Sequence, residues 1–267
     1  MSLDVVIEGV GLWSPLLPGW DASRAILRGA AQPAAEAAGR PAPSLLAPNE
    51  RRRAPESVLL AFETAQQACA MAGRDPGSMP AVFASAYGDL AINDYLCATL
   101  VQSAHDVSPT KFHNSVHNAP AGYWAIATGC MASTSAISAG QATFGAGLLE
   151  AALLAVSENV PVLFVVYDIA AVGALAGIIA TRGAFGAALV LAPQREHAGA
   201  ALRIDLADRP AAVLAPDPWL LHPLHRDNPA AHGVPLLTAL AHGRAQSVGL
   251  PAGPRKHLHL EIATWQN

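Results

Sequence analysis

The sequence predicts an α/β protein in which helices cover a largely buried sheet. Short runs of β-branched or small apolar residues alternate with longer segments of helical periodicity. A chain of 267 residues is long enough for a substantial core. Of these residues 52% belong to the set AVILMFWYC, and only 13% are charged, against roughly 25% in an average globular protein. So little charge indicates that a partner covers part of the surface.

The first elements are a strand and two helices. Residues 3–10 form an apolar strand, which we expect to be closed by Gly9 and Gly11. Residues 19–48 are typical of a helix followed by an irregular connection. Apolar positions at helical spacing predict a second helix over residues 55–73, where a glycine ends it.

The middle of the chain alternates between strands and helices, which favours a layered sheet. The expected order is a strand into a turn at 79–89, a helix at 91–105, a polar segment with prolines at 108–122, a strand at 124–128, a helix at 134–151, and strands at 160–168 and 183–193.

The last third differs, because residues 195–235 are rich in Pro, His and Asp and show little periodicity. A helix is expected at 234–243. Residues 256–262 alternate, with Leu258, Leu260 and Ile262 on one face and His257, His259 and Glu261 on the other. We interpret this segment as an edge strand that covers the main sheet. Its polar side is more typical of a solvated face than of a metal site, so we expect no metal.

Charge and cysteine usage exclude several classes of protein. The chain has 16 Lys+Arg and 20 Asp+Glu, a net charge of −4, and its one basic run, Arg51 to Arg53, is short. Nucleic-acid binding is therefore not expected. Cys69, Cys97 and Cys130 form neither a CxxC pair nor a disulfide framework, which favours a reducing, cytoplasmic setting.

Residues 160–180 are the best candidate for a membrane span, since Asp168 is their only charge. A proline and two glycines interrupt this stretch, and its β-branched first part is typical of a buried strand that ends in a turn. We therefore expect no membrane span. The N-terminus carries Asp4 and Glu8 where a signal peptide would need basic residues.

Cys130 is the candidate for nucleophilic chemistry. It follows a predicted strand and a glycine and precedes a predicted helix. Helix N–H groups at such a turn favour the thiolate form of a cysteine. The alternative is a small buried core residue, and the local pattern by itself favours this second interpretation.

Several segments together resemble a known family. The most specific is SPTKFHNSVHNAPAGYWAIATG at 108–129, and weaker matches include VVIEGVGLWSPL at 5–16, ERRRAPESVLLAFETAQQA at 50–68 and VPVLFVVYD at 160–168. Their order and spacing over residues 3–193 resemble the β-ketoacyl synthases of the thiolase-like fold. Within that family, the chain is most similar to the short chain-length-factor-like proteins of aryl-polyene clusters.

The resemblance implies roles for individual residues. It places an interface strand at 124–128 that pairs across a dimer axis, and it places Cys130 at the nucleophile, which in this family sits at the N-terminus of a buried helix. Phe185 corresponds to a gating loop, although it could equally be a core strand residue. The interface and tunnel positions it implies are Asn118, Gly122, Trp124, Ile126, Thr128 and Phe185.

The chain also departs from the family, whose condensation chemistry needs two histidines from a second thiolase-like half. Only 74 of the 267 residues follow residue 193, which is too few for that half. We therefore expect one complete half at 1–193 and a reduced extension at 194–267 that packs on the same domain. His232 and Gly233 resemble a histidine–glycine element of the family, but they lead into an apolar helix and are interpreted as a helix start.

The resemblance therefore implies a subunit of fatty-acid or polyketide (aryl-polyene) synthesis that needs no cofactor. It would act beside a complete β-ketoacyl synthase, or a second copy of itself, on chains bound to an acyl carrier protein. One alternative is an independent acyltransferase or condensing enzyme that uses Cys130 as the acyl acceptor. Another is a non-enzymatic assembly protein.

Overall fold

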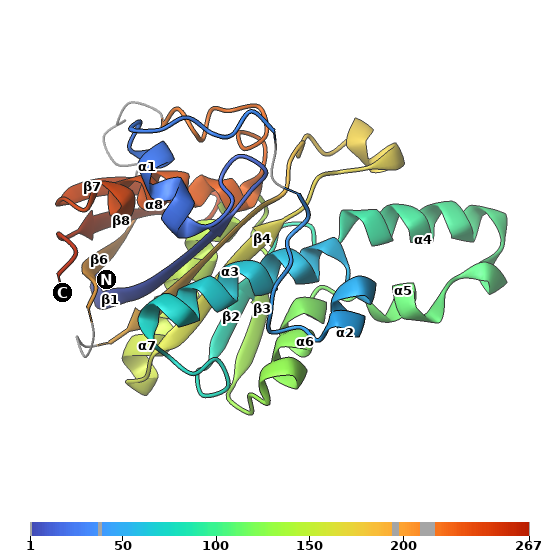
Figure 1. Cartoon of the computed structure of the whole chain (residues 1–267), viewed down its shortest axis with the longest axis horizontal. Coiled ribbons are helices and arrows are strands. Elements are labelled where there is room, and N and C mark those ends of the chain that lie inside the picture. Colours follow the sequence, from blue (N-terminus) through green and yellow to red (C-terminus); the bar gives the residue numbers. More distant parts are fainter. Residues whose placement is uncertain (1, 37–38, 194–197, 209–216, 267) are drawn as a thin grey trace.

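A computed structural model describes residues 2–36, 39–193, 198–208 and 217–266 (Figure 1). Its eight-stranded sheet has the order β3-β2-β4-β5-β1-β6-β8-β7, with helices on both faces. The strands are β1 (Ser2–Trp13), β2 (Ala81–Ala84), β3 (Thr134–Ile137), β4 (Val162–Asp168), β5 (Phe185–Ala192), β6 (Ala200–Ala207), β7 (Gln246–Pro251) and β8 (His257–Ile262). The α-helices are α1 (Trp20–Leu27), α2 (Pro48–Arg53), α3 (Glu56–Ala72), α4 (Leu90–Gln102), α5 (Pro109–His113), α6 (Ala119–Thr128), α7 (Thr143–Glu158) and α8 (Val234–His242). Four short 3-10 helices are η1 (Ala104–Asp106), η2 (Gly140–Ala142), η3 (Gly173–Gly177) and η4 (Pro229–Gly233).

Strand β1 is longer than predicted, because its glycines do not end it. A Cβ atom on Gly9 would lie 2.0 Å from the carbonyl oxygen of Ala68, and one on Gly11 would lie 1.9 Å from that of Thr64. Both carbonyl groups belong to α3. The two glycines are therefore needed where the backbone of α3 packs directly on the strand.

Most of the remaining elements are confirmed. The helix predicted over 55–73 is α3, and Gly73 ends it in the left-handed conformation with φ 63°. The strands predicted at 160–168 and 183–193 are β4 and β5, and every residue of both is buried. The membrane candidate thus begins as a core strand. No helix in the described ranges is long and apolar enough to cross a bilayer.

The strand predicted at 124–128 is wrong, because these residues form the second half of α6. A proline lies in the first turn of this helix, and Gly129 ends it with φ 69°. Both are helix boundary signals. Within the last turn, the Thr128 hydroxyl donates a hydrogen bond to the Trp124 carbonyl oxygen at 2.8 Å.

The helix predicted at 134–151 is wrong in its first part. Residues Thr134–Ile137 form β3, which pairs in parallel with β2. The helix α7 begins only at Thr143 and runs to Glu158. The strand, turn and buried helix that were expected around Cys130 therefore lie about ten residues later, around residues 134–143.

The C-terminal strands extend the same sheet. Leu258, Leu260 and Ile262 are buried, as the alternation predicted. Strand β8 is internal rather than an edge, because it pairs with β6 on one side and β7 on the other. The sequence did not predict β6 or β7. The proposed boundary after residue 193 borders residues 194–197, which lie outside the described ranges.

Helix α7 is covered on two opposite sides. A Cβ atom on Gly147 would lie 2.5 Å from the Phe164 ring of β4, and one on Gly145 would lie 2.1 Å from the carbonyl oxygen of Pro251 at the end of β7. Positions two apart on a helix point in nearly opposite directions. The C-terminal strands thus cover the face of α7 that β4 and β2 leave open.

Helices α4 and α5 project from the sheet at one end of the molecule, and we call residues 90–113 the arm (Figure 1). The Asp89 carboxylate accepts a hydrogen bond from the Ile92 amide at 2.9 Å, which caps α4. The Ser108 amide donates to the Tyr95 hydroxyl at 3.0 Å, and the Lys111 Nζ lies 3.7 Å from the centre of the Tyr95 ring. These contacts hold α5 against α4.

Candidate functional site

Three turns meet where the parallel strands β2, β3 and β4 end. In open α/β sheets, the carboxyl ends of the strands are where ligand sites form. The Ser138 hydroxyl after β3 donates to the Ala86 carbonyl oxygen after β2 at 3.1 Å. The Gln141 side-chain amide reaches the Tyr87 hydroxyl at 3.4 Å. These contacts join the turn before α7 to the turn before the arm.

The N-terminal turn of α7 contains no cysteine. Gly140 has φ 55°, and the Thr143 hydroxyl donates to its carbonyl oxygen at 2.7 Å. The same hydroxyl accepts the Ala139 amide at 3.0 Å. Ala139, Gly140 and Gln141 are exposed at this turn, and Gln141 has the longest side chain of the three.

His232 reaches this turn from the C-terminal part of the chain. It lies directly before α8, as predicted, and it also contacts the backbone of Gln141. Burial lowers the pKa of His232, and the contact with Gln141 opposes this shift. A Cβ atom on Gly233 would lie 1.8 Å from the Phe144 ring, so the chain can approach α7 this closely only with glycine here. This contact was not predicted, although the His232–Gly233 pair was the feature of the sequence that could have indicated it.

Cys130 lies after α6 rather than before a helix, so its expected position at a helix N-terminus is wrong. Only 4% of the residue is exposed. Its thiol donates to the Met79 carbonyl oxygen at 3.4 Å, and its amide donates to the Thr128 hydroxyl at 3.3 Å. The free N–H groups that would favour a thiolate are at the start of α7. The geometry agrees with the interpretation of Cys130 as a small buried residue.

The predicted interface and tunnel residues fall into two groups. Trp124 is fully buried in the core, where its ring meets that of Phe62 edge-on at 5.1 Å. Phe185 is also fully buried, at the start of β5, and packs edge-on against the His225 ring at 5.2 Å. The others lie on α6 or at its start: Asn118, Gly122 and Ile126 are exposed, and Thr128 is half-buried.

Strand β3 leaves one edge of the sheet open. The carbonyl oxygens of Ser133 and Ile137 accept hydrogen bonds from the amides of Ala81 in β2 and of Ser85 directly after it. In a parallel ladder, alternate residues bond to the same neighbour. Thr134 and Ala136 therefore direct their backbone N–H and C=O groups away from β2, toward the open edge.

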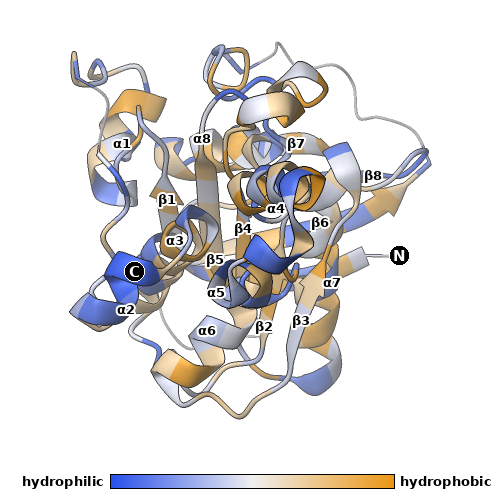
Figure 2. Cartoon of the chain, turned by 90° about the vertical axis from the view of Figure 1, so that its right-hand side faces the viewer, coloured by the Kyte–Doolittle hydropathy of each residue, from blue (hydrophilic) through white to orange (hydrophobic). Residues whose placement is uncertain are grey.

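Exposed apolar side chains gather at the end of the molecule that bears the arm. Eight of the twelve large apolar residues that are exposed in the described ranges lie on or beside the arm, α6 and η3. We call them the open face: Leu100, Val101, Phe112, Val116, Ile126, Met131, Val172 and Ile178. Figure 2 shows α4, α5, α6 and β3 turned toward the viewer at this end of the molecule. An apolar surface of this kind marks an interaction site.

A basic segment is formed by α2, whose last three residues are arginines. The Arg51 guanidinium donates to the Pro43 carbonyl oxygen at 3.1 Å and is half-buried. Arg52 and Arg53 are exposed. The segment therefore presents positive charge on a chain whose net charge is negative.

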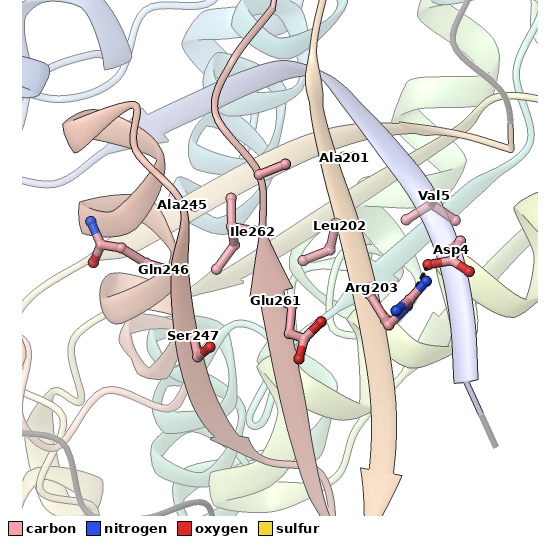
Figure 3. A pocket seen from close by; sticks show the side chains of 11 residues that line it. Asp4, Val5, Ala201, Leu202, Arg203, Ala245, Gln246, Ser247, Glu261 and Ile262 are labelled. Atoms are coloured by element: carbon pink, nitrogen blue, oxygen red, sulfur yellow. Dashed lines mark hydrogen bonds and ion pairs between the residues drawn. The ribbon is translucent and has the colours of Figure 1, made fainter.

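An open groove of about 640 Å³ lies far from this site, on the strands at the other end of the sheet (Figure 3). Its polar residues lie opposite one another across β1, β6 and β8. The Arg203 guanidinium bonds to the Asp4 carboxylate at 2.9 Å, and Glu261 lies opposite Arg203 on the next strand. These side chains partly neutralise one another, which is typical of a solvated sheet face. No cluster of three His, Cys, Asp or Glu suited to a metal was found among the described residues.

The sheet, with a buried helix that follows an open edge strand, is the thiolase-like fold of the ketosynthases. The family model for the β-ketoacyl synthase N-terminal domain matches residues 23–215, and the chain belongs to this family. No curated protein matches the chain.

Solved structures support the same fold. The ketosynthase ApeO in complex with its chain length factor ApeC, from Xenorhabdus doucetiae, is similar with a TM-score of 0.73, 20% identity and coverage of 97% of this chain and 99% of that chain. The ishigamide ketosynthase/chain length factor has a TM-score of 0.68, 15% identity and coverage of 98% and 99%. A type II polyketide ketosynthase, AntDE, bound to its acyl-carrier protein AntF, has a TM-score of 0.70, 11% identity and coverage of 99% and 100%.

Proposed function

We propose that this chain is a chain-length-factor-like subunit that pairs with a complete β-ketoacyl synthase. The pair would extend polyketide chains of the aryl-polyene type, held on an acyl carrier protein. The observation that carries the proposal is the N-terminal turn of α7. In the family that the chain resembles, the nucleophile sits at the N-terminus of a buried helix. The buried helix of this structure is α7, and the turn before it consists of Gly140, Gln141 and Ala142 rather than of Cys130. Without a thiol at this turn, condensation would belong to the partner.

The partner would dock on the open face and on the edge of β3. Strand β3 would take the interface role that the family resemblance implied for residues 124–128. The backbone groups of its Thr134 and Ala136 point away from β2 and can pair with another strand. The exposed apolar side chains beside it would lose contact with water on docking, which stabilises association. Two similar structures are ketosynthases with their chain length factors, which supports this pairing.

The deciding experiment is co-expression with the ketosynthase encoded nearest to this chain, followed by a pull-down and a condensation assay. We expect a stable one-to-one complex that is active only when both chains are present. A ketosynthase that is fully active alone and does not bind this chain would overturn the proposal.

Two sets of variants test the docking surface. Ile126→Arg and Met131→Arg each place a charge on the open face and should prevent complex formation. Val156→Arg is the matched control, because Val156 is an exposed apolar residue on α7 outside the open face. Ala136→Pro removes one outward N–H of β3 and should weaken binding, whereas Ala136→Ser keeps it.

The acyl carrier protein would meet the exposed arginines of α2. An acidic carrier surface suits this segment, and charge pairs of this kind mainly raise the association rate. Arg52→Glu with Arg53→Glu should therefore slow transfer from the carrier, most strongly at low salt, and leave the ketosynthase complex intact. Unchanged kinetics at low salt would exclude this docking position.

The alternatives are separated by different readouts. An independent acyltransferase or condensing enzyme would acquire an acyl group on Cys130 when the chain is incubated with acyl thioesters, which intact-protein mass spectrometry detects. The buried position of the thiol gives this function less support. A non-enzymatic assembly protein would bind its partner with residues 108–150 away from the partner's cavity.

A further inference from the structure

Asp168 is a fully buried carboxyl group that the proposed function does not use. It ends β4, and its Oδ1 atom accepts three hydrogen bonds from the turn that follows β2. The donors are the Ser85 hydroxyl at 2.8 Å, the Ala86 amide at 2.9 Å and the Tyr87 amide at 3.2 Å. One oxygen atom thus fixes three consecutive residues of that turn.

The second carboxyl oxygen, Oδ2, is buried without a hydrogen-bond partner in the described part of the chain. The Ala230 amide is near enough to favour the charged form, but its N–H donates to Asn228 Oδ1 at 2.9 Å. The Asn228 side chain in turn donates to the carbonyl oxygens of Asp168 and Gly183. A proton on Oδ2 would also find no acceptor there, but an unbonded buried charge costs far more free energy than an unbonded buried O–H group. The unbonded Oδ2 therefore favours the neutral carboxyl group.

The turn that Asp168 holds carries the arm. The Ser85 hydroxyl accepts the Gly88 amide at 2.9 Å, and the Asp89 carboxylate then caps α4. On the other side, the His117 imidazole bonds to the Ser85 carbonyl oxygen at 2.8 Å, which ties the segment before α6 to the same turn. Helix α4 and the segment before α6, which bear part of the open face, are therefore anchored on residues that Asp168 positions.

We propose that Asp168 is a proton-dependent positioning residue, whose neutral carboxyl group keeps the arm and α6 in the arrangement that binds the partner. Loss of its proton would draw water or another donor toward Oδ2 and loosen the turn at residues 85–88. This inference rests on the proposed function, because it concerns how the same open face is held.

The groups that surround Asp168 do not offset such a charge. Tyr167 precedes it on β4, and burial, together with the nearby Asp168 and Asp89, raises the pKa of this phenol. The Tyr87 hydroxyl is turned to Gln141. His117 bonds to the Ser85 carbonyl oxygen, and burial keeps the pKa of His232 in η4 low. No lysine or arginine bonds to the Asp168 carboxylate within the described residues.

The test measures binding to the ketosynthase partner across the pH range. We expect the dissociation constant of the unmodified chain to rise about tenfold between about pH 6 and pH 8.5, since only the neutral form binds well. Asp168→Asn keeps an acceptor toward the turn and cannot ionise, so its affinity should change little with pH. Asp4→Asn, on an exposed carboxylate at the far end of the sheet, should follow the unmodified chain.

Hydrogen exchange of the amides of Ala86 and Tyr87, measured on the chain alone, separates this inference from the proposed function. Exchange corrected for intrinsic rate should accelerate above neutral pH in the unmodified chain and not in Asp168→Asn. Binding without any difference between these two chains, in affinity or in exchange, would overturn the role of Asp168. The expected exchange difference without binding at any pH would instead overturn the proposed function.

Discussion

Gly145 of α7 lies so close to Pro251 of β7 that a Cβ atom would come within 2.1 Å of the Pro251 carbonyl oxygen. The two residues are far apart in sequence, and their contact packs β7 directly on α7. The end of β7 thus covers one side of the buried helix.

Gly145→Ala should destabilise the chain, because backbone on both sides must move to admit one methyl group. Overpacking of this kind costs about 1–3 kcal/mol, measured as the change in the free energy of unfolding in denaturant. Gly122→Ala is the matched control, since nothing lies within 4 Å of its added Cβ. Because Gly122 is exposed within a helix, its replacement by alanine should raise the free energy of unfolding by about 0.5–1 kcal/mol. Equal stability of the two variants would contradict the close packing of β7 on α7.

Substitution of Trp124 should lower stability, whereas substitution of Ile126 should weaken partner binding, although both residues lie on α6. Trp124 is fully buried against Phe62 and Phe83, so Trp124→Ala should cost about 3–5 kcal/mol of unfolding free energy. Ile126 is 87% exposed, so Ile126→Ala should leave the unfolding midpoint almost unchanged and weaken partner binding. Thermal unfolding and a binding titration of each variant check both expectations.

The three thiols should differ in reactivity. Cys97 on α4 is exposed, whereas Cys69 and Cys130 are buried. Burial also raises the pKa of Cys69 to about 12, with a smaller contribution from Asp75. A maleimide should therefore add once to the native chain and three times in denaturant, as read by intact mass. Rapid modification of Cys130 in the native chain would instead favour the acyltransferase alternative.

Stability should depend on pH through Asp168, because burial raises the pKa of this carboxyl group to about 7, against the opposing hydrogen bonds from Ser85 and the turn amides. Between the ordinary pKa of an aspartate and this value, the folded chain holds a proton that the unfolded chain releases. Stability therefore falls by about 1.4 kcal/mol per pH unit from this group as the pH rises through that window, and levels off above it.

Two histidines have the opposite effect on the pH dependence of stability. Burial lowers the pKa of both His225 and His232, so these groups destabilise the folded chain as the pH falls. The comparison of the unmodified chain with Asp168→Asn removes their contribution, since both chains contain them. The difference in unfolding free energy between the two should shrink or reverse in favour of Asp168→Asn as the pH rises from about 5 to 8. A difference that stays constant with pH would contradict an aspartate that is neutral at acidic pH.

The local sequence pattern was sufficient to predict a helix or strand where that element has its own periodicity or end signals. The helical spacing before Gly73 predicted α3, the β-branched run at 160–168 predicted β4, and the alternation at 256–262 predicted which face of β8 is buried. The pattern was misleading at 124–143, where small residues are compatible with both strand and helix. There a proline and a left-handed glycine made α6 a helix, and pairing with β2 made residues 134–137 a strand.

The candidate site was only partly predictable for the same reason. The family resemblance followed from residues 108–129, but the position before the buried helix could not be assigned until that helix was located. The turn before the buried helix α7 contains Gln141, and Cys130 lies before β3 instead. The sequence could not show that Trp124 and Phe185 are buried and Ile126 is exposed, because burial depends on which side of an element packs against the core.

The sequence by itself determined the family, the α/β class and most strands and helices, since these follow from local periodicity, turn residues and motif order. Only the tertiary structure decided what lies together. It brought His232 to the start of α7, placed the three donors of one turn on Asp168, and left β3 as an open edge. Contacts between residues far apart in the chain arise from packing and strand pairing, which no local pattern specifies.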